Sequence, residues 1–143
     1  FAEGAYPAAV QAITLKQMLG SKVPVAILLD RDELGDAAHK LLTEKLKWDK
    51  KLALKYSCWV PNHGKAYVEA EDMFSQSFLE AFVREYGDNN VLEEKTKYPG
   101  GQFHYGFTLA AKELFVEFVK QSLQRSNVGY WGDVLNRIRA SFN

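Results

Sequence analysis

VPVAILLDRDE, at residues 23–33, is the stretch that decides the expected fold. Its first seven residues are all apolar, and charged residues follow them immediately. A run that is short and apolar at every position is typical of a strand buried on both faces of a parallel sheet. Pro24 fits only near the start of such a strand, because proline cannot donate a ladder hydrogen bond. We therefore expect an interior strand over Val23–Leu29, with Asp30 at its carboxyl end.

Segments with helical spacing lie on both sides of this strand, and strands and helices alternate along the chain. The expected helices cover Pro7–Leu19, Asp36–Trp48, a segment after Glu71-Asp72, Phe107–Arg125 and Gly129–Phe142, with a second strand over Lys51–Val60 and a loop over Gly87–Gly106. This alternation predicts an α/β fold with a mainly parallel central sheet flanked by helices and added C-terminal helices. The 143 residues suit one domain, 1–143, which we expect to be a fragment of a longer chain because it begins without Met.

Composition excludes several classes of protein. The chain is 47% apolar and 13% aromatic, which excludes disordered and collagen-like proteins. Its 18 basic residues balance 18 acidic ones, so tight nucleic-acid binding by this surface alone is not expected. The longest apolar run is about a third of the ~20 residues that a membrane helix needs. The single cysteine, Cys58, suits a reducing compartment, and we expect a soluble, cytoplasmic protein without a membrane partner.

Acidic residues stand where a parallel sheet binds ligands. Asp30 and Asp32 leave the expected strand two residues apart, so both carboxylates can face one hard cation. Glu3 precedes a helix as if it ended an earlier strand, and Glu71-Asp72 opens a later helix. Each acid also has a purely structural interpretation, because aspartates cap helices and acids favour the first helical turn. We expect Glu3, Asp30, Asp32 and one acid of the Glu71-Asp72 pair to converge within reach of bridging metal ions.

Lys112 is the basic residue that the pattern singles out. It lies on a helical stripe with Phe115, Val116 and Val119, where a solvated lysine is not expected. The alternative is that its stem covers the edge of an apolar face while the ammonium reaches water. The three histidines have no metal-ligand spacing, so the sequence does not predict a zinc site.

These motifs together resemble the TOPRIM domain, and especially its version in the OLD (overcoming lysogenization defect) family of ATP-dependent endonucleases. The resemblance extends over nearly the whole chain and rests on the order of four motifs: Phe1-Ala2-Glu3-Gly4, the DxD strand Ala26–Glu33, Glu71-Asp72-Met73-Phe74 and Lys112-Glu113-Leu114-Phe115. It implies a metal-dependent nuclease module that hydrolyses DNA phosphodiester bonds.

The resemblance also implies a role for each matching residue. Glu3 is the general acid/base or a metal ligand, and Lys112 stabilises charge at the transferring phosphate. Asp30 and Asp32 hold a first Mg²⁺ or Mn²⁺, and Glu71 or Asp72 serves a second ion. The implied partners are DNA and an ATPase domain in the same chain or in another one, and self-association into a homo-oligomer is left open. Two cations and a lysine suit phosphodiester hydrolysis, because they neutralise the charge that develops on the oxygens.

One departure from the family pattern keeps alternatives open. Pro7 stands about where family members commonly carry an aspartate, so the chain is also compatible with a degenerate TOPRIM scaffold without activity. A second alternative is a phosphatase of the haloacid dehalogenase type, in which Asp30 is a covalent nucleophile. Against it, Glu33-Leu34 replaces that family's Gly-Thr after the DxD motif.

Overall fold

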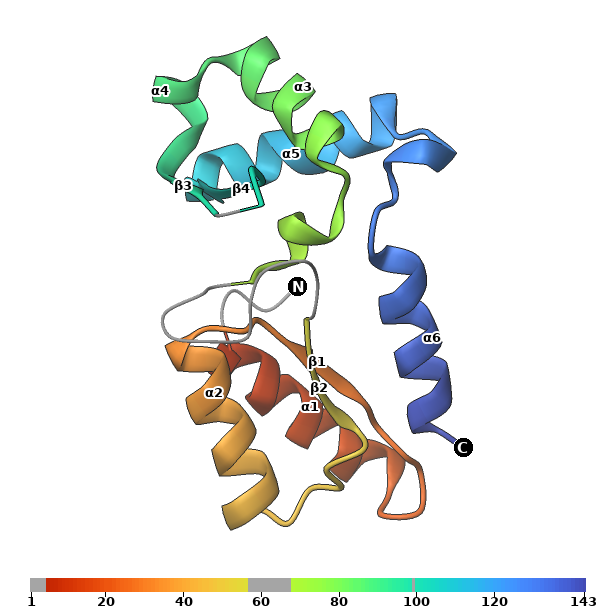
Figure 1. Ribbon diagram of the computed structural model, residues 1–143. Helices are drawn as coiled ribbons and strands as arrows, with labels where there is room; N and C mark the ends of the chain where they lie inside the picture. Colours follow the sequence, from red (N-terminus) through yellow and green to blue (C-terminus); the bar gives the residue numbers. More distant parts are fainter. Residues whose placement is uncertain (1–4, 57–67, 99) are drawn as a thin grey trace. The chain divides into compact units, whose positions relative to one another are not determined.

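Strand β1 (Ile27–Leu29) and strand β2 (Ala53–Lys55) form a two-stranded parallel sheet in a computed structural model of the chain (Figure 1). The structure describes residues 5–56, 68–98 and 100–143. They form two units by their internal contacts: unit 1 comprises the described residues of Phe1–Ala70 with Asp133–Asn143, and unit 2 comprises those of Glu71–Gly132. The chain is therefore a mixed α/β protein, as expected, and the expectation of a single domain stays a prediction.

The predicted first strand is shorter than its apolar run. Pairing begins at Ile27, whereas Val23 is 39% exposed and its N–H donates to the Gly20 carbonyl in a turn. Pro24 explains the late start, because it lacks the N–H that a paired position needs. Ile27 and Leu29 are buried but Leu28 is only half-buried, so β1 is not fully covered on both faces as the sequence predicted.

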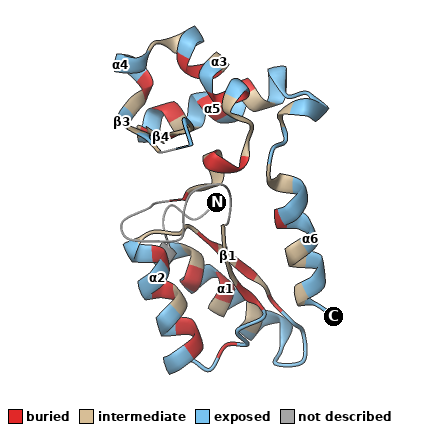
Figure 2. Cartoon of the chain, in the orientation of Figure 1, coloured by how far each residue is buried: buried red, intermediate tan, exposed pale blue. Residues whose placement is uncertain are grey.

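Two helical segments accompany the sheet in unit 1. Helix α1 (Ala5–Leu19) contacts both β1 and helix α2 (Glu33–Lys40), which continues as the π-helical segment η1 (Leu41–Lys45). Both helices were predicted, with boundaries that differ by a few residues. Figure 2 shows buried positions, in red, on α1, α2 and β1. The core of unit 1 comprises Ala9, Ala12, Val25, Ile27, Leu29, Ala38, Leu42, Trp48, Leu52 and Ala53.

Unit 2 has a phenylalanine-rich core between two helices and a hairpin. The short 3-10 helix η2 (Ala70–Met73) leads into α3 (Gln76–Tyr86) and the one-turn α4 (Asp88–Val91), and α5 (Leu109–Ser122) follows the hairpin. The ring of Phe82 lies 5.0 Å from that of Phe115 and 5.1 Å from that of Phe107, at steep angles typical of aromatic pairs. After α5 come the 3-10 helix η3 (Arg125–Asn127) and α6 (Trp131–Ser141), which crosses the unit boundary.

The prediction of a loop over Gly87–Gly106 is wrong. It contains α4 and an antiparallel hairpin of β3 (Leu92–Lys97) and β4 (Phe103–Phe107). The sequence concealed β3 because its residues are almost all charged or polar and largely exposed, so it has no buried apolar alternation. Its partner β4 supplies the buried face, with Tyr105 3% and Phe107 4% exposed. The hairpin places the next residue of interest, His104, inside unit 2.

Candidate functional site

Asp30 and Asp32 flank an extended residue directly after β1. The backbone of Arg31 pairs with that of Val68, with N–O distances of 2.8 Å from the Arg31 N–H and 3.0 Å from the Val68 N–H. Asp32 is also extended, with φ of −142°. Residues two apart in an extended segment project to the same side, so the two carboxylates share one side of the chain. This part of the predicted metal site is compatible with the local backbone.

The Asp32 carboxylate is already used by the protein. Its Oδ1 accepts a hydrogen bond of 2.6 Å from the Gly35 N–H, which caps the start of α2. This is the structural interpretation that competed with metal binding. The two are not exclusive, because a carboxylate has about four acceptor positions and the cap uses one. The cap therefore leaves Asp32 able to accept a cation as well, and the pair Asp30 and Asp32 stays a prediction.

Gly35 allows the chain to fold tightly at this junction. A Cβ atom at this position would overlap the carbonyl oxygen of Asp30 and lie 3.1 Å from Asp32 Oδ1. Only glycine permits so close an approach. The first turn of α2 is thus held against the backbone of the two acids.

In unit 2, Glu71 and Lys112 lie next to each other. Glu71 Oε1 is 3.8 Å from Lys112 Nζ, and the two side chains are 15% and 35% exposed respectively. Glu71 comes from η2, and Lys112 comes from the first turns of α5, where Thr108 Oγ1 caps the helix by accepting from the Ala111 N–H at 3.1 Å. The structure therefore brings together two of the residues predicted for the site, as an ion pair that water reaches.

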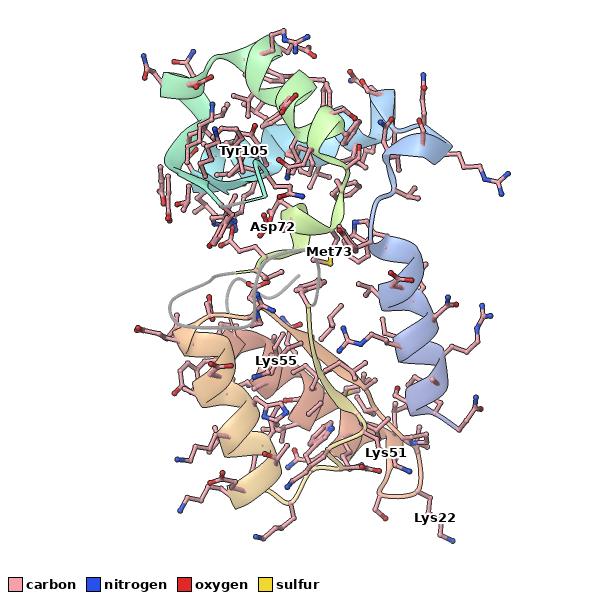
Figure 3. The ribbon with its side chains drawn as sticks, viewed as in Figure 1. Lys22, Lys51, Lys55, Asp72, Met73 and Tyr105 are labelled. Carbon is pink, nitrogen blue, oxygen red and sulfur yellow. The ribbon has the colours of Figure 1, made fainter. Side chains whose placement is uncertain are left out.

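Asp72, the neighbour of Glu71, lies on η2 (Figure 3) and is deeply buried. Both of its carboxylate oxygens lie 2.9 Å from Nδ1 of His104 on β4, and the two side chains are 1% and 4% exposed. An ionised carboxylate only accepts, so Nδ1–H is the donor. With both oxygens facing one histidine nitrogen and almost no exposure, Asp72 does not fit a metal ligand in this arrangement. Glu71 fits better, because its carboxylate is accessible.

Backbone hydrogen bonds also fix the C-terminal end of η2, the 3-10 helix that carries Glu71 and Asp72. The Tyr130 N–H donates to the Met73 carbonyl at 2.6 Å, and the Ser75 N–H donates to the Asn127 carbonyl at 3.0 Å. A Cβ atom at Gly129 would overlap the Met73 carbonyl oxygen, so the backbones are in close contact there. Gln76 also binds the Phe103 backbone, donating to its carbonyl at 3.0 Å and accepting from its N–H at 2.9 Å. These contacts join η2 and α3 to the hairpin and to the segment after α5.

Tyr105 is the titratable group of unit 2 with a clear shift. Burial raises the pKa of its phenol above the ordinary value of 10.0, and the negative charges of Glu80 and then Asp88 raise it further. Lys95 Nζ lies 5.6 Å from the centre of the Tyr105 ring and 4.9 Å from that of Phe103. This is a packing feature of the hairpin, and no predicted site residue takes part in it.

The predicted site is thus present in parts. In the described ranges, no three His, Cys, Asp or Glu side chains are grouped so that they could hold a metal ion. Glu3 lies outside the described residues, and the convergence of all the predicted acids stays a prediction. Sequence reasoning missed His104, which is 32 positions from its partner and lies on a strand taken for a loop. The signal that was available is the alternation of Phe103, Tyr105 and Phe107 after a Gly-rich turn, which points to a hairpin.

Comparisons with known proteins found no match: no protein-family model, curated protein or solved structure matches the chain. Within the part of the chain that the structure describes, none of the helices combines the length and the apolar character needed to cross a membrane.

Proposed function

We propose that the chain is a metal-dependent nuclease module with a TOPRIM-like fold, which hydrolyses DNA phosphodiester bonds. The observation that supports this most is the position of Asp30 and Asp32 on either side of the extended Arg31, directly after a strand of a parallel sheet. The alternation of an extended backbone favours both side chains on one side. Ligand sites in open α/β sheets lie at the carboxyl ends of the strands. Paired carboxylates there suit Mg²⁺ or Mn²⁺, which take oxygen ligands.

Each residue has a role in this proposal. Asp30 and Asp32 would hold a first divalent cation, which would supply Lewis-acid stabilisation of charge on the phosphate oxygens. In unit 2, Glu71 is the acid proposed to serve a second cation, and Lys112 would neutralise charge on the transferring phosphate. Glu3 is retained as the general acid/base. DNA is the substrate, and an ATPase domain in the same chain or in a partner supplies the remaining DNA grip, since the chain has no net charge.

Asp30→Asn tests the proposal in a DNA cleavage assay. With Mn²⁺ or Mg²⁺ present, the wild-type chain should cleave DNA, and the variant should lose at least about 10-fold in rate, because losing even a residue that only orients a metal ligand costs roughly 10–100-fold. Asp49→Asn is the matched control, since it makes the same change on an exposed residue of unit 1 whose Oδ1 accepts from the Lys51 N–H, a bond that asparagine retains. Cleavage should be unchanged in the control.

The outcomes also separate the alternatives. Equal cleavage in the wild type and Asp30→Asn would overturn the assignment of Asp30. Hydrolysis of a phosphate monoester that depends on Asp30, without DNA cleavage, would favour the haloacid dehalogenase type of phosphatase. Absence of both activities at millimolar Mn²⁺, with the ATPase partner supplied, would favour a scaffold without activity.

A further inference from the structure

The buried pair Asp72 and His104 is the feature of unit 2 that the proposed function does not use. Burying a carboxylate is costly unless a partner compensates it, and here a single histidine nitrogen faces both oxygens. The pair joins the four-residue helix η2 to strand β4, and its two residues are 32 positions apart in the chain. Such a contact constrains the orientation of the turn more than a surface ion pair would.

The residue before Asp72 is Glu71, and the two side chains point in different directions. Successive residues of a 3-10 helix are about 120° apart, because the helix has three residues per turn. Asp72 therefore points to His104 on β4 while Glu71 points to Lys112 on α5. If η2 rotated so that Asp72 left His104, the same rotation would carry Glu71 away from Lys112.

The end of the turn cannot absorb that rotation. The Met73 backbone carbonyl accepts from the Tyr130 N–H, and the Phe74 N–H donates to the backbone carbonyl of Glu71. The Ser75 N–H donates to the Asn127 carbonyl. These bonds fix the C-terminal side of η2. Loss of the Asp72–His104 bond would therefore be expressed at Glu71 and Asp72 themselves, because the buried Asp72 carboxylate loses a hydrogen bond that offsets the cost of its burial.

We infer that His104 is a positioning residue: through its hydrogen bond to Asp72 it fixes the turn that holds the Glu71 carboxylate beside the Lys112 ammonium. Asp72 then serves the site by orientation rather than as a metal ligand. This inference rests on the proposed function only for the role of Glu71 and Lys112 in the reaction. The positioning itself is a property of unit 2 and is measured without activity.

Zero-length carbodiimide crosslinking measures the position directly. The reagent activates a carboxylate, and a lysine amine in contact with it then forms an amide while the activating group leaves as a urea. Both Glu71 and Lys112 are accessible enough to react, so the full wild-type chain should give a Glu71–Lys112 crosslink detectable by mass spectrometry. Absence of this crosslink in the wild type would overturn the inference.

The variants separate positioning from general damage. His104→Phe removes the donor and keeps a ring, and it should reduce the crosslink at least about fivefold. His104→Asn keeps an N–H near the Nδ1 position and should retain most of it. Tyr105→Phe, a change of similar size at the next buried position of β4, should give the wild-type yield. Equal crosslinking in His104→Phe and the wild type would contradict the proposal.

A double variant keeps the test decisive if His104→Phe fails to fold. Replacing both partners by apolar groups of similar shape is often nearly neutral for stability, so Asp72→Leu combined with His104→Phe should fold. It should still lose the crosslink, and a wild-type yield in it would overturn the inference.

DNA cleavage gives the second readout, and it separates the two proposals. If Glu71 acts through its position, Glu71→Gln should lower kcat in the wild type and cause little further loss in His104→Phe, with KM for DNA unchanged. Additive losses would contradict the positioning role. If the wild type does not cleave DNA but the crosslink behaves as described, the proposed function fails and the positioning of Glu71 stands.

Discussion

Asp32 and Asp72 show how neighbours decide what a carboxylate does. Asp32 is half-buried and caps α2 through one oxygen, so its carboxylate retains acceptor positions that water or a cation can reach. Asp72, 1% exposed, is the most buried carboxylate among the described residues and has both oxygens on His104. The same residue type is therefore a candidate metal ligand in one place and an internal tether in the other.

Tyr105 gives a prediction about alkaline stability. Its pKa is raised in the folded state by burial first and by Glu80 and Asp88 next. The folded state therefore keeps the proton when the unfolded state has lost it, so the contribution is full below about pH 10 and is lost as the pH rises through the folded-state pKa. We expect the free energy of unfolding to fall above about pH 10, and Tyr105→Phe to make this fall shallower.

Urea unfolding at about pH 9 and about pH 10.5 measures the effect of Tyr105. Tyr6→Phe, which changes a tyrosine that is 47% exposed, is the control and should leave the alkaline fall unchanged. The same fall in wild type and Tyr105→Phe would show that another group titrates.

At the scale of elements, helices were the most predictable part of the chain. The helices expected over Pro7–Leu19 and Phe107–Arg125 correspond to α1 and α5. In α5 the apolar spacing also marks the buried face, with Phe115 and Phe118 inside, whereas α1 buries Ala9 and Ala12 and leaves Val10 and Met18 exposed. Strand boundaries were less predictable, since only three residues of the run Val23–Leu29 pair with β2. Pairing depends on a partner that the local sequence does not contain.

The candidate site, like the strand boundaries, could be predicted only in part. Asp30 and Asp32 could be placed after a strand because the apolar run ends there, and the contact of Glu71 with Lys112 joins two residues that the motifs had selected. The role of Asp72 could not be predicted. It depends on a hairpin whose polar strand β3 has no buried apolar pattern, and the alternation of Phe103, Tyr105 and Phe107 indicates a strand without showing that His104 contacts Asp72.

Thr108→Ala tests how firmly α5 begins at the position that presents Lys112. Thr108 Oγ1 accepts from the Ala111 N–H at 3.1 Å, and losing such a cap costs about 1 kcal/mol. The denaturation midpoint should fall accordingly. Thr108→Ser keeps the hydroxyl and should recover most of the loss; a serine variant as unstable as the alanine one would show that the methyl group, not the cap, is responsible.

At the scale of the whole molecule, the chain combines two units with different cores and no net charge. Unit 1 packs small and branched residues around a parallel strand pair, and unit 2 packs phenylalanine rings against a hairpin. A neutral chain has little electrostatic attraction for DNA by itself, which fits a module that takes its DNA grip from the ATPase partner that the resemblance implies. The central claim is the divalent cation at Asp30 and Asp32.

Thermal melting with and without Mn²⁺ tests that claim most directly. A ligand that binds only the folded state at 100 times its dissociation constant contributes about 2.7 kcal/mol. At about 2–4 °C per kcal/mol, the wild-type melting temperature should rise by roughly 5–10 °C. Asp30→Asn should lose most of this rise, because it removes one of the two carboxylates proposed to hold the cation. An equal rise in both proteins, or none in the wild type at millimolar Mn²⁺, would contradict the account.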